Sequence, residues 1–390
     1  MRSVKMTILY IFTLDFGEII NSYFFTKDQP FRVVFACPPP LFPWTDQAHA
    51  TKYQYTTRED LIRIIEETKP RLIILSSGYL FQVFNLFSLS ELHKLISYVK
   101  ESNIPYVTTD PWMKIWMKYS VLEICNNAHG MLLGYDILQK QLNDTFKNVY
   151  HLYPFPITEN QCLSFFNPKT VMTKVEKNSH EEQLKVFFQK TGHYDNCSDK
   201  RLPGFNMFVL SDMDFKMSFY GPNKTKINKL FKGLFNRLSE IIYNTSDILV
   251  IVAPNQCCEI LTNQFSKQTR ICFLPFCKFS LFYSLLMCAK VVLYWNVFST
   301  SILGRILNHF PVYFFSKGHM VTLCPKLYEH GVPFFYQKHP PFFIDPLSSI
   351  PANLFQEPFE VVKSTFQEIS KHWRLLKTPE EIVLELIKES

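Results

Sequence analysis

The stretch MTILYIF, residues 6–12, is followed by TLDFGE, residues 13–18, and then by a helix-compatible segment that runs to Phe25. A short and continuous apolar run is typical of a strand that is buried on both faces of a sheet, and such strands occur mainly in parallel sheets. A buried strand, a turn with a glycine and a helix together form the start of a parallel α/β unit. The beginning of the chain therefore predicts an α/β fold.

The same order of elements recurs through the first half. A second apolar run, residues 31–37, ends at three consecutive prolines that can continue neither a strand nor a helix. Thr57 has an acid three residues later, which is a capping-box arrangement and predicts the start of a helix. The remaining predicted elements are a helix at 88–99 and strands at 71–77, 104–109 and 149–152. This alternation predicts an N-terminal, doubly wound Rossmann-like domain over residues 1–157.

The second half repeats this pattern after a polar stretch. Residues 158–183 are predicted to be a linker or an insertion, and a second Rossmann-like domain is expected over residues 184–350, starting with a strand at 184–188. Residues 351–390 are predicted to be C-terminal helices that return to the first domain. Two tandem α/β domains face each other across a cleft in this prediction, and ligands of such folds bind at the carboxyl ends of the strands.

Composition narrows the range of functions. The net charge of +7 is spread over 390 residues without a basic run, which argues against a nucleic-acid-binding protein. A small anionic ligand or peripheral contact with an anionic membrane surface is compatible with this charge. Most cysteines lie in apolar runs, which predicts buried thiols in a reducing compartment and a cytoplasmic protein. Cys257 and Cys258 have no second pair at zinc spacing, so no metal site is expected. The chain carries no signal for an oligomeric state.

A polar turn in the second half is the strongest candidate site. Residues 270–318 are predicted to run strand, helix, strand, and then the turn Asn296 to Ser301 leads into another helix. Ser299, Thr300 and Ser301 stand where that helix is expected to begin, so backbone N–H groups and hydroxyls converge and favour an anion. Ordinary capping of a helix by Ser or Thr is the alternative interpretation.

This arrangement resembles the C-terminal domain of the two-Rossmann-domain (GT-B) glycosyltransferases, a fold shared by related nucleotide-sugar epimerases. In those families the equivalent turn grips the diphosphate of the donor. The resemblance implies donor binding by Asn296, Ser299, Thr300 and Ser301, with Arg305 one turn further on. The chain lacks the Gly-Gly pair and the Glu of the familiar pattern, so it is identified as an atypical member.

The first half supplies candidates for the acceptor side. The resemblance places the turn at residues 13–18 opposite an acceptor, where Asp15 or Glu18 would be the general base. The alternative is that Asp15 caps a helix and Glu18 lies in its first turn. Asp110 and Trp112 follow the fourth strand, where an acceptor could stack on the indole and hydrogen-bond the carboxylate.

Three histidines in predicted loops complete the candidates. His193 follows the first predicted strand of the second domain, beside Gly192, which would let a phosphate approach closely. We therefore expect a catalytic role for His193, a donor-binding role for Gly192 and His319, and an acceptor-binding role for His49. A solvated loop histidine is the alternative in each case.

The predicted function is the transfer of a sugar, of the hexosyltransferase type, from a nucleotide-sugar donor to an acceptor hydroxyl. No metal or other cofactor is expected, and the nucleotide sugar is a co-substrate. Two alternatives remain open. One is a nucleotide-sugar epimerase, which would need acidic residues in the second domain. The other is a non-catalytic nucleotide-sugar-binding or scaffold protein of the same fold, favoured by the missing Gly and Glu residues.

Overall fold

The computed structural model divides into two compact units, Met1–Thr170 with Lys371–Ser390, and Val171–Ser370. We call these the first unit and the second unit. The structure describes residues 6–389 except 79, 84, 110–144, 147, 194–200, 220–231, 237, 240–246, 266–268, 320, 322–325 and 346–358.

The first unit is built on a parallel sheet of seven strands in the order β3-β2-β1-β4-β5-β6-β7. This order confirms the predicted doubly wound sheet. The strands are β1 Thr7–Ile11, β2 Arg32–Cys37, β3 Ala50–Gln54, β4 Leu72–Ser76, β5 Tyr106–Thr109, β6 His151–Tyr153 and β7 Cys162–Ser164. The sequence did not reveal β3 and β7, because both are partly exposed edge strands without a continuous apolar run.

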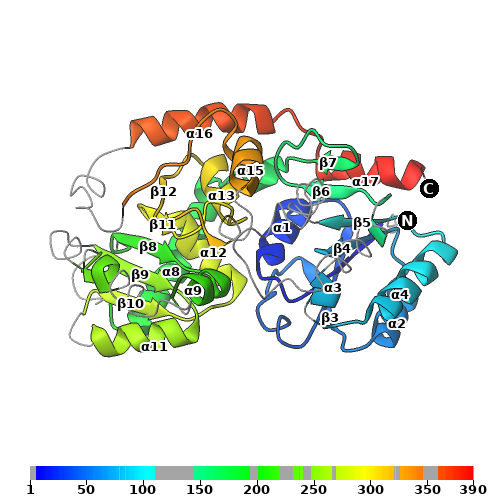
Figure 1. The fold of residues 1–390 in the computed structure, drawn as a ribbon, viewed down its shortest axis with the longest axis horizontal. Helices are drawn as coiled ribbons and strands as arrows, with labels where there is room; N and C mark the ends of the chain where they lie inside the picture. The colour runs from blue at the N-terminus through cyan, green and yellow to red at the C-terminus, as the bar shows by residue number, and fades with distance from the viewer. Residues whose placement is uncertain are drawn as a thin grey trace. The chain divides into compact units, whose positions relative to one another are not determined.

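Helices cover both faces of this sheet. They are α1 Gly17–Thr26, α2 Arg58–Thr68, α3 Leu80–Val83, α4 Leu89–Glu101 and α17 Pro379–Lys388. The predicted capping box at Thr57 is confirmed, since Thr57 and Asp60 bond each other's backbone N–H groups. Figure 1 shows α1 on one side of the strands and α2 and α4 on the other. Apolar side chains of α2 and α4 pack on β1, β2 and β4 in one buried cluster, and each fully buried Leu or Ile contributes about 2 kcal/mol.

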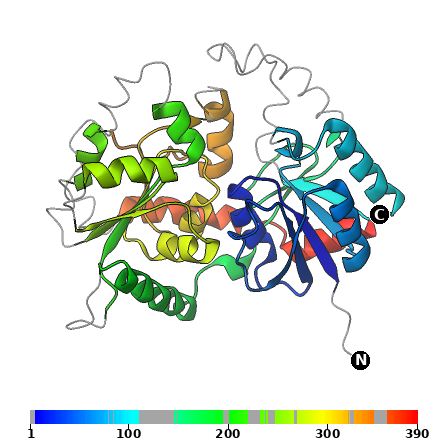
Figure 2. The same cartoon turned by 90° about the horizontal axis from the view of Figure 1, so that it is seen from below.

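The second unit has a parallel sheet of five strands in the order β10-β9-β8-β11-β12. The strands are β8 Phe205–Val209, β9 Ile248–Val252, β10 Ile271–Leu274, β11 Val292–Tyr294 and β12 Val312–Phe314. The helices are α8 Lys174–Lys190, α9 Asp212–Phe219, α11 Asn255–Gln264, α12 Phe279–Cys288, α13 Ile302–Leu307, α15 Lys326–Tyr336 and α16 Glu360–Trp373. Helices lie on both sides of each sheet in Figure 2. The chain is thus an α/β protein with two Rossmann-like doubly wound sheets.

The predicted strand at 184–188 is wrong, because these residues form the last part of helix α8. Thr173 and Glu176 make a capping box that starts the helix well upstream. Leu184 and Phe188, four residues apart, are both buried, whereas Val186 between them is 49% exposed. This is the spacing of a helix face and not of a strand. The first strand of the second sheet is β8, and α8 lies wholly in the second unit.

The C-terminal segment contains two helices, α16 and α17, and the residues from Lys371 onward belong to the first unit. Trp373 is completely buried at the end of α16. Among the helices that the structure describes, none combines the length and the apolar character that a membrane crossing requires.

Candidate functional site

Each sheet has one point where consecutive connections leave in opposite directions. In the first sheet this switch point lies between β1 and β4, and in the second it lies between β8 and β11. Loops diverge at the carboxyl ends of such a strand pair and leave room for a ligand. Polar side chains gather at both points, so each is described in turn.

Glu18 is the centre of the first switch point. It is the second residue of α1, and only 2% of it is exposed. Its carboxyl group accepts hydrogen bonds from the hydroxyls of Ser76 (3.0 Å) and Ser77 (2.7 Å) at the end of β4. Further donors are Thr109 at the end of β5 and Asn21 (3.0 Å) in α1. Glu18 therefore ties two strand ends to a helix.

The electrostatic environment of Glu18 favours a proton. Burial raises the pKa of Glu18 to about 7, and the nearby charge of Asp15 acts in the same direction. The hydroxyl donors oppose this shift without cancelling it. The expected location of Glu18 in the first turn of a helix is confirmed. Glu18 is buried, and its carboxyl group accepts four hydrogen bonds from the protein. The predicted role of Glu18 as a base that contacts the acceptor is therefore corrected to a structural role.

Asp15 lies in the turn that precedes α1 and is partly exposed. Its Oδ1 accepts the backbone N–H of Gly17 at 2.8 Å, so it satisfies one of the free amides at the helix start. Beside it, Phe16 is 40% exposed, and its ring centroid lies 6.1 Å from that of Trp44. This aromatic pair is not among the features predicted from the sequence. Asp15, Phe16 and Trp44 form the accessible part of the first switch point.

At the second switch point, the turn Asn296 to Ser301 joins β11 to α13. Asn296 Oδ1 accepts the backbone N–H of Phe298 at 2.7 Å. Ser299 Oγ lies 2.8 Å from Ser301 Oγ, which lies 2.6 Å from the hydroxyl of Tyr294. Ser301 is buried and forms no side-chain cap of α13, so the capping alternative does not describe it.

The accessible groups of this turn are donors. Asn296, Ser299 and Thr300 are partly exposed. Within the described part of the chain, the backbone N–H groups of Ser299 and Ser301 donate no hydrogen bond. The N–H group of the partly exposed Ser299, together with its hydroxyl held in place by the buried Ser301, is suited to an anion.

An acid–histidine pair lies beside this turn. Asp214, in the first turn of α9 after β8, is 1% exposed. Its Oδ1 accepts hydrogen bonds from the backbone N–H of His319 (2.7 Å) and from His319 Nδ1 (2.8 Å). Its Oδ2 accepts the hydroxyl of Ser211 at 2.6 Å. Burial opposes the ionisation of Asp214, but these hydrogen bonds outweigh it, and the pKa of Asp214 lies below its ordinary value.

Ser211 and Asp214 are not among the residues predicted from the sequence, although the sequence contains a signal for them. Ser211 is followed three residues later by an acid, which is the pattern that correctly located the helix after Thr57. The pattern was overlooked because β8 itself was not predicted. With β8 in place, Asp214 occupies the expected position of a site residue after the first strand of a doubly wound sheet.

Gly318 connects the histidine to the turn. Its φ of +89° is rare for residues with a side chain, and a Cβ atom there would lie 2.5 Å from Asn296 Cγ. The backbone before His319 therefore lies directly against the Asn296 side chain. The structure brings together Asn296, Ser299, Thr300, Ser301 and His319, all predicted from sequence, with Asp214 and Ser211; we call this group the second-unit cluster.

Arg305 does not belong to the second-unit cluster. Its side chain is fully buried and donates to four carbonyl oxygens. The acceptors are those of Leu286 (2.8 Å), Ala289 (2.9 Å), Lys290 (3.2 Å) and Pro311 (2.9 Å). The predicted donor contact of Arg305 is corrected to a structural role, because the guanidinium faces the interior and is occupied by the backbone.

Gly192 and His193 are also corrected. They follow the C-terminal end of α8, where carbonyl groups give the helix end a negative character that disfavours phosphate. His193 Nε2 lies 3.4 Å from the carbonyl oxygen of Ile271, the first residue of β10. This is the amino edge of the second sheet, opposite to the second-unit cluster. Gly192 has a φ of +73°, as expected for a residue that ends a helix.

His49 lies on the wrong edge of the first sheet for an acceptor site. It immediately precedes β3, and its Nε2 lies 2.8 Å from Thr26 Oγ1 in the last residue of α1. Burial lowers the pKa of His49. Glu18 and Asp15 lie at the opposite, carboxyl edge. Asp110 and Trp112 lie outside the described residues.

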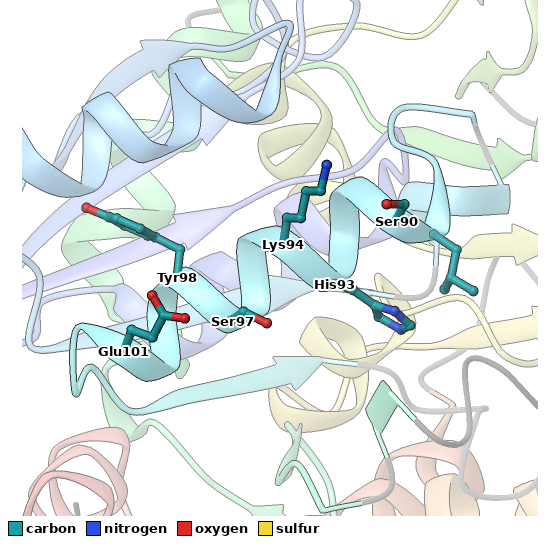
Figure 3. A pocket seen from close by; sticks show the side chains of 7 residues that line it. Ser90, His93, Lys94, Ser97, Tyr98 and Glu101 are labelled. Atoms are coloured by element: carbon teal, nitrogen blue, oxygen red, sulfur yellow. The ribbon is translucent and has the colours of Figure 1, made fainter.

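Two surface hollows contain none of the predicted site residues. One, of about 540 Å³, lies along α4 and is lined by side chains of that helix alone, among them His93, Lys94 and Tyr98 (Figure 3). The other, of about 700 Å³, lies at the amino edge of the first sheet and includes Lys69 and Arg71. Within the described ranges, no group of three or more His, Cys, Asp or Glu side chains is arranged to hold a metal ion.

Comparisons with known proteins agree with this architecture. No protein-family model and no curated protein sequence matches the chain. Among solved structures, the chain is similar to a UGT transferase from Siraitia grosvenorii in complex with UDP, with a TM-score of 0.51 and 9% identity over 99% of both chains. It is equally similar to UGT2 of Phytolacca americana complexed with UDP-2-fluoro-glucose and pterostilbene, with a TM-score of 0.51 and 9% identity over 100% of both chains.

At this level of identity the likeness concerns the fold. The chain has the two-Rossmann-domain fold of the GT-B glycosyltransferases, as the resemblance in its sequence implied. Its likeness to both structures extends over almost the whole chain, so both units take part in it.

Proposed function

We propose that this protein binds a nucleotide-sugar donor in its second unit and transfers the sugar to an acceptor hydroxyl without a metal ion. The observation that carries the proposal is the turn at residues 296–301, which presents the backbone N–H group and the hydroxyl of the partly exposed Ser299 at the second switch point. A diphosphate has only acceptor oxygens, so this set of donors matches it.

The surroundings of the turn support an anionic ligand. The buried pair of Ser301 and Tyr294 holds the Ser299 hydroxyl in position, so little conformational freedom is lost on binding. The two solved structures of the same fold are complexes with UDP and with UDP-2-fluoro-glucose. By analogy with these two complexes, we include nucleotide binding by this chain in the proposal.

We propose that the accessible part of the first switch point is a separate binding surface for a ligand that carries a hydroxyl group. Asp15 offers a carboxylate that can accept a hydrogen bond from a hydroxyl, and the exposed ring of Phe16 and the half-buried ring of Trp44 offer an apolar surface. The seven described cysteines are free thiols, which supports the expected cytoplasmic location.

Calorimetry with UDP and UDP-glucose tests donor binding. We expect Ser299→Ala to weaken UDP binding about tenfold, because one hydrogen bond to a charged group is lost. Ser364→Ala is the matched control, since that hydroxyl lies on α16 and bonds only the carbonyl of Val361. Equal UDP affinity of Ser299→Ala and the unaltered protein would remove this turn from the proposal.

A non-catalytic nucleotide-sugar-binding protein is the second candidate. The burial of Glu18 favours this second candidate. The carboxyl group at the first switch point accepts hydrogen bonds from the end of β4 and is not accessible to a substrate. Product analysis after incubation with UDP-glucose separates the two candidates. A transferase or hydrolase releases UDP, whereas a binding protein returns the donor intact.

A further inference from the structure

The geometry of Asp214 and His319 defines the protonation pattern of the imidazole. Nδ1 of His319 lies 2.8 Å from Asp214 Oδ1, and a carboxylate can only accept, so Nδ1 carries the hydrogen. The second carboxylate oxygen accepts from Ser211, which holds the carboxylate plane in place. In the neutral ring, Nε2 is then the atom with the free lone pair.

Nε2 is also the accessible atom of the pair. Asp214 is buried, whereas 13% of the His319 side chain is exposed. Among the residues placed by the structure, none makes a hydrogen bond to His319 Nε2. Gly318 holds this segment against Asn296, so His319 lies beside the turn to which we assign the donor.

Helix capping alone does not account for this arrangement. Asp214 accepts the backbone N–H of residue 319, and it could do so whatever side chain that residue carried. The additional hydrogen bond from Nδ1 requires a histidine at this position. It leaves the other ring nitrogen, Nε2, facing outward. An acid that orients an imidazole in this way is the usual support for a histidine that transfers protons.

We propose that His319 is the general base of the transfer reaction and that Asp214 is the residue that positions it. This inference rests on the proposed function and replaces the predicted base in the first unit. Glu18 cannot reach a substrate, because only 2% of the residue is exposed and its carboxyl group accepts four hydrogen bonds. His319 has a free acceptor atom at the carboxyl edge of the sheet that carries the donor turn.

The step balances without a further reactant. The acceptor hydroxyl gives its proton to Nε2 of His319 while its oxygen forms a bond to the anomeric carbon of the sugar. The bond from that carbon to the diphosphate oxygen breaks, and the electron pair leaves with the nucleoside diphosphate. The resulting imidazolium is stabilised by the adjacent Asp214 carboxylate and later returns its proton to water.

UDP-glucose with water as the acceptor tests this assignment. We expect His319→Gln to lower kcat for UDP release about 100-fold, while the dissociation constant of UDP changes by less than about threefold. Asp214→Asn should lower kcat about tenfold or more at unchanged KM, because the amide no longer enforces the tautomer. The matched control is His339→Gln, since His339 also faces a carboxylate, with Nε2 3.2 Å from Glu368 Oε2, outside the second-unit cluster. Its kcat should equal that of the unaltered protein.

The outcomes separate the two proposals. No binding of UDP or UDP-glucose to the unaltered protein would remove the proposed function itself. Normal UDP binding with unchanged kcat in His319→Gln would overturn only the assignment of the base. Normal binding with no UDP release by the unaltered protein would also overturn it and leave the binding protein. Carbethoxylation by diethyl pyrocarbonate, mapped by mass spectrometry, adds a readout without turnover: UDP-glucose should protect His319, and unprotected His319 at saturating donor would contradict the placement of Nε2 near the donor.

Discussion

The two units place a buried acid at the same topological position and use it differently. Glu18 and Asp214 each follow the first strand of their sheet and lie in the first turn of the next helix. Glu18 is surrounded by neutral donors, three hydroxyls and one amide, and its pKa is raised to about 7. Asp214 is paired with an imidazole and a hydroxyl, and its pKa is lowered.

This difference follows from the groups to which Glu18 and Asp214 are hydrogen-bonded. In the first unit Glu18 itself ties the ends of β4 and β5 to α1, so it is part of the framework. In the second unit the fully buried Arg305 binds four backbone carbonyls around the start of β11. Asp214 in that unit bonds a partly exposed side chain, His319, in place of strand ends. The same topological position is thus structural in the first unit, and we propose a chemical role for it in the second.

Replacing Arg305 should have the largest effect on this comparison. Arg305→Leu removes four hydrogen bonds to carbonyl oxygens in the interior of the second unit, of which Pro311 O keeps the N–H of Val292, and we expect a loss of about 4 kcal/mol in the free energy of unfolding. Urea denaturation followed by tryptophan fluorescence measures it. A loss below about 1 kcal/mol would show that the framework of the second unit does not depend on this residue.

Glu18 should make stability depend on pH in the neutral range. Its folded pKa of about 7 lies above the ordinary value of 4.5, so the unfolded chain releases this proton at lower pH. As the pH rises from 4.5 to about 7, the free energy of unfolding of the unaltered protein should therefore fall by about 3 kcal/mol relative to Glu18→Gln. Parallel pH profiles of the two proteins would show that Glu18 is not perturbed.

Asp214 should produce a smaller effect of opposite sign. Because its folded pKa is lowered, its charged form stabilises the protein at neutral pH, and this contribution is lost as the solution is acidified below about pH 4. We expect Asp214→Asn to cost about 1.5 kcal/mol at neutral pH, since two hydrogen bonds to a charged group are weakened. In acid the two proteins should converge. A constant difference at all pH values would contradict a charged Asp214.

The sequence was sufficient where one local pattern decides one element. The buried strand near residue 6, the helix that begins after Thr57, the helix predicted at 88–99 and the strand around residues 271–274 all follow from periodicity or capping. The polar turn at 296–301 was also recognisable, because its hydroxyls stand between a buried strand and a helix. The edge strands β3 and β7 and the strand β8 were not, because their patterns are short or mixed.

The pattern of apolar residues by itself thus determined that this chain is an α/β protein with two doubly wound sheets. The reason is that a strand buried on both faces needs a continuous run of apolar residues, which is visible in the sequence. The tertiary structure alone decided which polar residues meet. Asp214 and His319 are 105 positions apart, and Glu18 and Thr109 are 91 apart. Only the order of strands in each sheet brings such residues within hydrogen-bond distance, and the same order places His49, Gly192 and His193 at the opposite edges. Spacing along the chain cannot report this, because sheet order depends on packing between elements that are distant in sequence.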